Sequence, residues 1–239
     1  MSKVGVLVPA AGLGVRLGPG GPKALRELAG EPLLLHAVRG LRAAPSVGLV
    51  VVAAPPAEVG AVAALLGEYD VIVVAGGAER QDSVRLALAA LPQSADLVLV
   101  HDAARCLTPV WVIEAVVAAL VAGADAVVPV LPVVDTVKQV DGDVVRATVD
   151  RVSLRAVQTP QGFRRDVLEK AHAAGACAST PALTDDAGLV EALGVEVTAV
   201  AGDDLAFKVT RPIDLLLAEA LLAVRAPVEG RHGGGRHAR

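Results

Sequence analysis

The sequence predicts an α/β fold: a Rossmann-like, mostly parallel sheet flanked by helices, with a protruding β-hairpin arm. Short valine-rich runs alternate with longer helical patterns along most of the chain, which is typical of right-handed βαβ units. This rhythm breaks once, where apolar and polar residues alternate on both sides of Asp141-Gly142. The 239 residues are 54% hydrophobic but only 2% aromatic, so we expect a sizeable core built from Ala, Val and Leu.

In the first part of the chain, apolar runs of strand length predict five buried strands, at 4–10, 47–54, 70–77, 97–100 and 125–132. Helical spacing and start signals predict four helices between them. These are a helix over 32–42, a helix that begins at Pro55-Pro56, a helix capped by Asp82 or Ser83, and a helix from Thr108-Pro109 to Val121.

The second part begins with the arm, at about 133–153. Asp-Gly between alternating segments is a strong hairpin signal, and a lone hairpin is marginal in water. We therefore expect the arm to pair with a second copy of the chain. Beyond it we expect helices over 164–174, 184–194 (capped by Thr184 or Asp185) and 211–224, and strands over 195–202 and 205–210. Residues 1–225 are predicted to form a single domain and 226–239 a disordered tail, in which His232 and His237 are interpreted as part of a frayed end.

Composition excludes several classes of protein. The net charge of −4 and the scarcity of aromatic side chains argue against nucleic-acid binding. Two cysteines, Cys106 and Cys177, are too few for a disulfide framework, which favours a reducing, cytoplasmic setting. No signal peptide and no apolar run of membrane-spanning length is recognisable, so no membrane association is expected.

The first strand runs directly into a loop, 11–23, that contains five glycines together with Arg16 and Lys23. Such a loop allows backbone N–H groups to approach an anion closely, so it predicts a cradle for a triphosphate. It is not a Walker A loop, because Pro22 precedes the lysine and no hydroxyl follows it. Nor is it a dinucleotide fingerprint, because Leu17 stands at the third glycine position. The plain alternative is a glycine-rich connection with two solvated charges.

Two later segments also leave the carboxyl ends of predicted strands, where ligands gather in open α/β sheets. Gly76-Gly77 leads toward Ser83, for which helix capping is an equally good explanation. Asp102 follows the strand 97–100 and is a hard oxygen ligand suited to Mg²⁺ on phosphates. The alternative for Asp102 is a capping carboxylate paired with Arg105.

Seven motifs, taken together, identify a resemblance. They are PAAGLGVRLGPGGPK, GGAERQDSV, VHDAAR, DTVK, DR–(x)6–QTPQGF, TDDA and FKVTRP. In this order, and to about Val224, the chain resembles the 2-C-methyl-D-erythritol 4-phosphate cytidylyltransferases. The resemblance implies a glycosyltransferase-A-like nucleotidyltransferase fold and transfer of CMP from CTP to methylerythritol phosphate in the non-mevalonate isoprenoid route. It also implies a homodimer whose arms reach across to the partner.

The resemblance further implies a role for each matching residue. Contacts to the nucleotide are implied for Ala10, Ala11, Gly12, Gly14, Gly77, Ser83, Asp102 and Ala103. Arg16 and Lys23 would neutralise the phosphates, and Asp102 would also face the metal shell or the substrate hydroxyls. Arg151 and Lys208 would hold the acceptor phosphate. The rest of the acceptor pocket would come from Arg105, Thr136 and Thr184, some of them supplied by the partner.

Two residues depart from the usual pattern: Cys106 stands where proline often follows HDAAR, and Ile213 replaces an acidic residue. Cys106 is interpreted as an inert buried thiol, the alternative being an alkylation-sensitive one. Two other functions stay open. A ribitol 5-phosphate cytidylyltransferase would share most nucleotide motifs, and a catalytically silent nucleotide-binding protein would share the fold.

Overall fold

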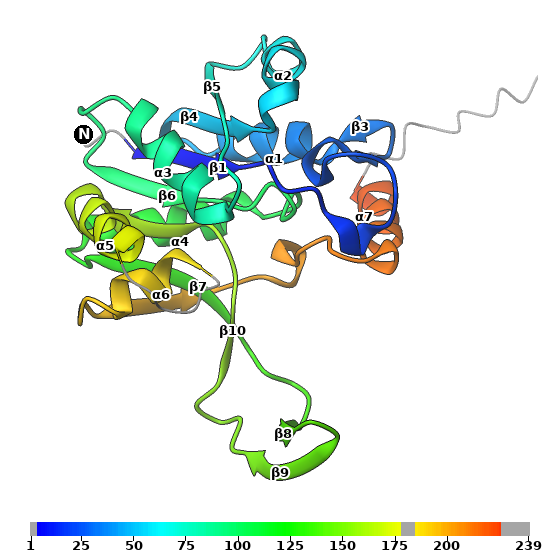
Figure 1. Cartoon of the computed structure of the whole chain (residues 1–239), viewed down its shortest axis with the longest axis vertical. Helices are drawn as coiled ribbons and strands as arrows, with labels where there is room; N and C mark the ends of the chain where they lie inside the picture. Colours follow the sequence, from blue (N-terminus) through cyan, green and yellow to red (C-terminus); the bar gives the residue numbers. More distant parts are fainter. Residues whose placement is uncertain (1–3, 178–184, 226–239) are drawn as a thin grey trace, which may run out of the picture.

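The structure, a computed structural model, describes residues 4–177 and 185–225 (Figure 1). The expectations for Thr184 and for the tail 226–239, with its two histidines, lie outside these described residues.

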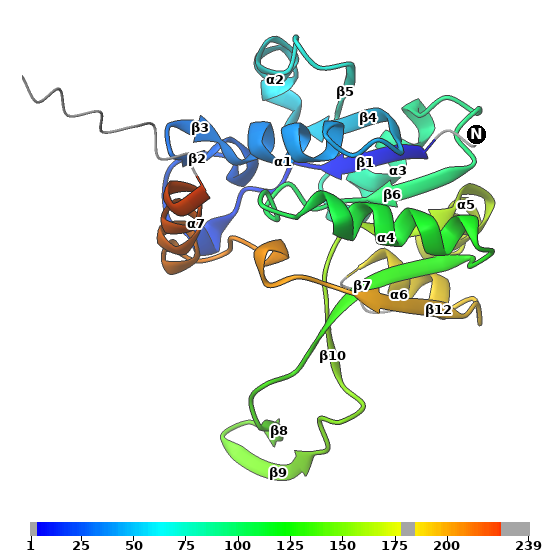
Figure 2. The same cartoon turned by 180° about the vertical axis from the view of Figure 1, so that it is seen from behind.

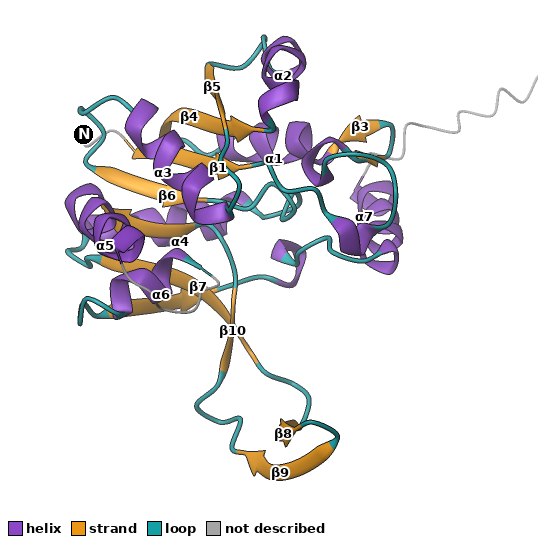
Figure 3. Cartoon of the chain, viewed as in Figure 1, coloured by secondary structure: helices purple, strands orange, loops and turns teal. Residues whose placement is uncertain are grey.

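The centre of the fold is one sheet of eight strands (Figure 3). Its parallel half is built around β1 (Val4–Pro9), which lies between β4 (Val47–Ala54) and β6 (Leu97–Val100). The strand β5 (Val71–Ala75) extends this half beyond β4, again in parallel. All four strands fall within the valine-rich runs that predict them, so the mostly parallel α/β fold is confirmed.

The other half of the sheet is mixed and is organised by β7 (Ala126–Pro132). The strand β12 (Val197–Ala201) pairs with β7 in parallel. Two short antiparallel strands, β10 (Arg155–Val157) and β11 (Gln161–Arg164), lie along its opposite side, and β11 also joins β7 to β6. The sequence did not predict these two strands, because their polar residues show no alternating pattern.

Helices cover both faces of the sheet. On one face lie α3 (Arg80–Ala90), α5 (Arg165–Cys177) and α6 (Asp186–Glu191), which are in front in Figure 1. The other face, seen in Figure 2, carries α1 (Leu33–Arg42), α2 (Val59–Leu65) and α4 (Val110–Val121). Such a three-layer arrangement buries the sheet on both sides, which explains why its strands are almost continuously apolar.

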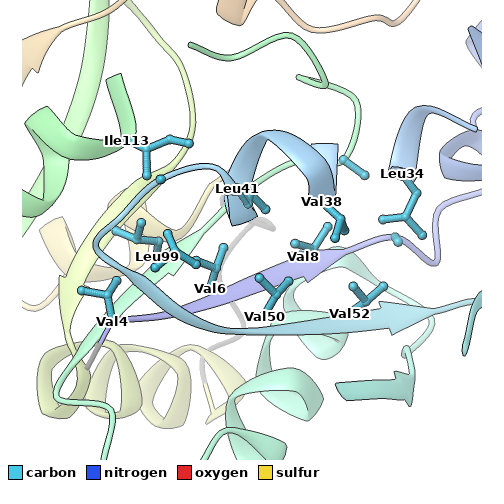
Figure 4. Close-up of a cluster of buried hydrophobic side chains, with 14 of the residues drawn as sticks. Val4, Val6, Val8, Leu34, Val38, Leu41, Val50, Val52, Leu99 and Ile113 are labelled. Carbon is cyan, nitrogen blue, oxygen red and sulfur yellow. The ribbon is translucent and has the colours of Figure 1, made fainter. Parts of the chain in front are cut away.

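Strand periodicity assigns the side chains of β1 to two separate cores. Val6 and Val8 point to the face where Val38 and Leu41 of α1 lie (Figure 4). Leu7 points the other way and joins the cluster under α3 and α5. The first strand is therefore buried on both sides, and the loop that follows it starts from a rigid point.

A third, smaller apolar cluster lies beside the sheet. It joins Leu17 of the glycine-rich loop to Leu28 in the small hairpin β2–β3 (Glu27–Leu28, Glu31–Pro32), to Leu107 after β6, and to Ala218 of α7 (Pro212–Arg225). This cluster ties segments from four parts of the chain to one another.

Several local predictions were wrong. The helix α3 begins at Arg80, so Asp82 and Ser83 lie in its first turn and do not cap it. The segment 205–210 is not a strand: it holds a 3₁₀ turn, Asp204–Ala206, followed by extended chain. The helix α5 continues to Cys177, beyond the expected end at residue 174.

The arm consists of β8 (Val137–Asp141) and β9 (Val144–Val149), which pair with each other in a sheet of their own. The predicted turn is confirmed, with Gly142 at a φ of 55°. The hairpin projects away from the main sheet (Figure 1), and Val140, Val144 and Val145 are 59%, 52% and 57% exposed on it. No helix in the ranges 4–177 and 185–225 is long and apolar enough to cross a membrane.

We predict that Leu99→Ala lowers the free energy of unfolding by about 2–5 kcal/mol, because Leu99 is fully buried on β6. Denaturant unfolding followed by circular dichroism measures this change. Leu216→Ala is the matched control: Leu216 is 61% exposed on α7, so the expected change is within about 0.5 kcal/mol. Equal losses for both variants would contradict the described core.

Candidate active site

The carboxyl ends of β1, β5 and β6 meet at one edge of the sheet, and the loops that leave them enclose two adjoining cavities. The first, the glycine-loop cavity, has a volume of about 250 Å³. The second, the arm-side cavity, has a volume of about 210 Å³ and lies toward β10 and α6. Arg80, Asp102 and Lys208 line both cavities and form the wall between them.

Most of the residues singled out from the sequence line the glycine-loop cavity. They are Ala10, Ala11, Gly12, Gly14, Arg16, Lys23, Gly77, Ser83, Asp102, Ala103 and Lys208. Arg105 lines the arm-side cavity instead. Thr136 and Arg151 are exposed, and neither lines either cavity.

The glycine-rich loop owes its path to a few local contacts. Gly14 adopts a φ of +66°, and a Cβ at this position would lie 2.4 Å from the Cβ of Lys23, so only glycine fits without strain. Lys23 N–H donates to the carbonyl of Gly12 over 3.1 Å. Arg26 Nη1 donates to the carbonyls of Gly18 and Pro19, 3.0 and 2.7 Å away. The loop is therefore folded back so that Lys23 faces the cavity.

Ser83 supports the opposite side of the same cavity. The backbone N–H of Gly77 donates to Ser83 Oγ over 3.1 Å, and Ser83 Oγ donates to the carbonyl of Glu79 over 3.2 Å. Ser83 thus fixes the Gly76-Gly77 turn from within α3, which explains its burial at 2% exposure.

Asp102 is the central charge of the site. Its Oδ1 lies 3.2 Å from Arg80 Nε, and its Oδ2 lies 2.7 Å from Lys208 Nζ. Burial alone would raise the pKa of this carboxyl, but Arg80 and Lys208 outweigh that effect and hold the pKa well below its usual range. Asp102 is therefore an ionised carboxylate at the wall of both cavities.

The backbone of Asp102 is held by a chain of hydrogen bonds. Its N–H donates to Thr159 Oγ1 over 3.1 Å, and Thr159 Oγ1 lies 3.2 Å from His101 Nδ1. Burial lowers the pKa of His101 to about 4, so the ring is neutral at pH 7 and shares a single hydrogen bond with the Thr159 hydroxyl. His101 therefore supports the loop and carries no charge into the site.

Lys208 reaches the wall from an extended segment that belongs to no strand. The N–H of Val209 donates to the carbonyl of Ala104 over 2.8 Å, and Arg105 Nη1 donates to the carbonyl of Ala206 over 2.7 Å. Arg105 Nη2 also donates to the carbonyl of Val157. The buried Arg105 Nε has no hydrogen-bond partner among the described residues, and a cation with an unpaired donor suits an anionic ligand.

Cys106 lies next to the site but faces the third apolar cluster. Burial raises the pKa of its thiol to about 12, so almost no thiolate exists at pH 7. This agrees with the interpretation of an inert, buried cysteine.

Arg80 is the main site residue that the sequence analysis did not single out. The helix was expected to start at Asp82 or Ser83, which left Arg80 in an unassigned turn. The N-cap residue Glu79 makes no side-chain capping hydrogen bond, so the true start had no local signal. Gln158, Gln161 and Asp185 of the arm-side cavity were also missed.

A glycine-rich loop at the carboxyl end of a central strand, facing several cations and one ionised carboxylate, defines the site of a nucleotidyltransferase on an α/β fold. The comparisons with known proteins agree. Residues 4–224 match the family model of 2-C-methyl-D-erythritol 4-phosphate cytidylyltransferase (IspD). The chain belongs to this family.

Individual relatives cover nearly the whole chain. The 2-C-methyl-D-erythritol 4-phosphate cytidylyltransferase of Frankia casuarinae is 59% identical over 95% of this chain and 84% of its own length. That of Saccharopolyspora erythraea is 58% identical over 91% of this chain and 98% of its own. The crystal structure of the Thermus thermophilus enzyme of that name has a TM-score of 0.75 at 39% identity, over 92% of this chain and 99% of that one.

The environment of Lys23 predicts a pH dependence. Burial and the neighbouring Lys208 lower the pKa of Lys23 to about 8, so the ligand-free protein loses this charge as the pH rises through about 8. A bound polyanion favours the protonated amine and raises the pKa again. We therefore expect binding of CTP near pH 8 to take up a proton, and the affinity for CTP to fall above that pH.

Titration calorimetry at pH 8, in buffers of different ionisation enthalpy, measures this uptake. Lys23→Met should abolish it, and Lys170→Met should preserve it, because the Lys170 side chain is 70% exposed on α5. The pH dependence of folding stability runs in the opposite direction to that of CTP affinity. Between about pH 8 and 10.5, the unfolded chain binds more protons at Lys23 than the folded chain does. The contribution of Lys23 to the free energy of unfolding therefore rises with pH. Undiminished uptake by Lys23→Met would contradict the assignment.

Proposed function

We propose that the chain transfers CMP from CTP to 2-C-methyl-D-erythritol 4-phosphate, releasing pyrophosphate and forming 4-diphosphocytidyl-2-C-methyl-D-erythritol, a step of isoprenoid biosynthesis. The observation that carries this proposal is the pair of adjoining cavities with a shared wall of Arg80, Asp102 and Lys208. Transfer between two phosphates needs two anion sites in contact. The family match over residues 4–224 supplies the identity of the two substrates.

In this reaction a phosphate oxygen of the acceptor attacks the α-phosphorus of CTP, in line with the departing pyrophosphate. Two anions must approach each other, so their repulsion is the main obstacle. Arg16 and Lys23 line the glycine-loop cavity and would neutralise the triphosphate, while Lys208 at the wall would face both reactants. Positioned cations act by electrostatic stabilisation and by fixing the geometry. A phosphate dianion is already nucleophilic near neutral pH, so no general base is assigned.

A divalent cation, Mg²⁺, is part of the proposal. Among residues 4–177 and 185–225, no group of three His, Cys, Asp or Glu side chains is placed to hold a metal by itself. The ionised Asp102 nevertheless fits an ion that arrives with the triphosphate, because Mg²⁺ commonly takes one or two protein carboxylates together with phosphates and waters. Asp102 would hold the metal, whose chemistry is to offset negative charge on the phosphates.

The proposed function is tested by pyrophosphate release from purified protein with CTP and Mg²⁺. Methylerythritol 4-phosphate and ribitol 5-phosphate are offered in parallel as acceptors. Turnover with methylerythritol phosphate alone supports the proposal. Turnover with ribitol phosphate alone would leave the nucleotide site intact and overturn the acceptor, and CTP binding without any turnover would favour a silent nucleotide-binding protein.

Loss of either loop cation should slow the chemical step. We expect Lys23→Ala and Arg16→Ala each to lower kcat on the order of 10²-fold or more, as loss of a preorganised charge contact does. Lys170→Ala is the control, because Lys170 pairs only with Asp166 on the exposed side of α5 among the described contacts. Steady-state kinetics at saturating CTP measures the effect. Near-normal turnover by either loop variant would remove that residue from the proposed mechanism.

The arm is proposed to complete the acceptor site of a second copy of the chain. Thr136 and Arg151 are exposed and line neither cavity of their own chain. Three valines of the arm's strands are more than half exposed, and an unpaired hairpin of this length is marginal in water. A homodimer formed through the arm would bury these valines and bring Arg151 to the partner's arm-side cavity. The cytoplasmic location expected from the sequence likewise stays a prediction.

Mixed dimers test whether Arg151 acts in the partner's site. Lys23→Ala and Arg151→Ala should each be nearly inactive as homodimers. In an equal mixture, half of the dimers carry one intact site, because the arm and the loop of that site come from different chains. Recovery should approach about a quarter of wild-type activity. No recovery, although mixed dimers are shown to form, would mean that Arg151 acts within its own chain or not at all.

A further inference from the structure

The proposed function assigns Arg80 no contact with a substrate, although Arg80 lies at the wall shared by both cavities. It belongs to the first turn of α3, and its guanidinium is held from two sides. Nε lies 3.2 Å from Asp102 Oδ1, and Nη1 lies 2.7 Å from Asp186 Oδ2. The two carboxylates come from different parts of the chain, the end of β6 and the start of α6.

Asp186 is the unusual member of this set. Its side chain is fully buried, at 0% exposure, and it lies 106 residues away from Arg80 in the sequence. Its second oxygen, Oδ1, is 3.0 Å from Nε2 of His172 on α5, and His172 is 5% exposed. A polar chain of His172, Asp186, Arg80 and Asp102 therefore runs from between two helices to the cavity wall.

Packing alone does not account for this chain. The neighbours of Asp186 on α6, Ala187, Leu189 and Val190, join an apolar cluster with Leu168 and Ala171 of α5. These contacts would hold the two helices together without a charge. A buried ion pair is weak support for stability, since apolar residues of similar volume often do as well. What Asp186 supplies in addition is a fixed direction for one guanidinium.

We propose that Asp186, held by His172, is a positioning residue that fixes the guanidinium of Arg80 at the wall between the cavities, where Arg80 contacts a phosphate of bound CTP. This proposal rests on the proposed function. It explains why Arg80 has two carboxylate partners: Asp102 would turn toward the ligand or its metal, and Asp186 would keep Arg80 in place when it does. A side chain held in advance loses less entropy on binding.

The proposal is tested by a double-mutant cycle with Asp186→Asn and Arg80→Met. Asp186→Asn keeps the shape of the side chain and removes its charge. We expect it to weaken CTP binding and to lower kcat, each by about tenfold, as small misplacements of a positioned group do. In the Arg80→Met background, Asp186→Asn should have no further effect on either quantity, because its only route to the ligand is gone. The same loss in both backgrounds would overturn the proposal.

Substitution of His172 provides a second test, which remains valid even if the Asp186 variants do not fold. Gln at position 172 can place an amide N–H near the position of Nε2, whereas Leu cannot donate. We expect His172→Gln to keep most of the CTP affinity and His172→Leu to lose about as much as Asp186→Asn does. Glu169→Gln is the matched control, because this α5 carboxylate pairs with Arg165 away from the cavities. Wild-type affinity for His172→Leu would remove His172 from the proposal.

Calorimetric titration with CTP alone separates this proposal from the acceptor assignment. If the wild-type protein turns over neither acceptor, the proposed function fails. The CTP dissociation constants of the double-mutant cycle still test whether Asp186 acts through Arg80. Melting temperatures are recorded for every variant. A loss of affinity that follows the loss of melting temperature across all variants, Glu169→Gln included, would indicate a purely structural role and would overturn the proposal.

Discussion

The site depends on how one ionised carboxylate, Asp102, is balanced against the cations around it. Arg80 and Lys208 each lie within 3.2 Å of its oxygens, so two positive side chains are gathered at the cavity wall before any ligand binds. Without Asp102 these cations would repel each other, and the loops that carry them would tend to separate. An anion site must be positive enough to attract phosphates and still fold when empty, and an internal carboxylate meets both demands.

The backbone arrangement that allows this balance comes from the third apolar cluster. Leu17, Leu107 and Val209 anchor the glycine-rich loop, the segment after β6 and the segment of Lys208 in the same small core. Each of these segments also brings at least one charged side chain to the wall or to a cavity beside it. Apolar contacts are not directional, but here they hold the backbone segments that carry the charged residues. The relative positions of these charges are therefore set by the packed cluster and not only by the conformations of flexible side chains.

Much of this could be predicted from the sequence, and the failures have local causes. Buried parallel strands are continuous apolar runs, so β4 was predicted to the residue, and Asp141-Gly142 specified the arm's turn.

Polar strands such as β11 gave no such signal, because their pairing depends on neighbours distant in sequence. The extended segment of Lys208 looked like a strand, but its partners are Ala104 and Arg105, outside any ladder. Arg80 was missed because its helix starts without a capping side chain. The contacts proposed for Arg151 with a second chain cannot be deduced from local sequence patterns.

Lys23 and Asp186 represent two ways in which the fold accommodates charge at this site. The positive charge of Lys23 is only partly balanced by the protein. Its pKa falls to about 8 because burial and Lys208 disfavour the cation, and a bound triphosphate would stabilise the cation again. Asp186 is the reverse, since both of its oxygens already have partners inside the protein. A group that must respond to the ligand is better left poorly satisfied, whereas a group that must stay fixed is better fully satisfied. Both kinds of charged group, those that respond to the ligand and those that stay fixed, lie at the same edge of the sheet. Arg80 connects them, because it contacts Asp102 at the cavity wall and the buried Asp186.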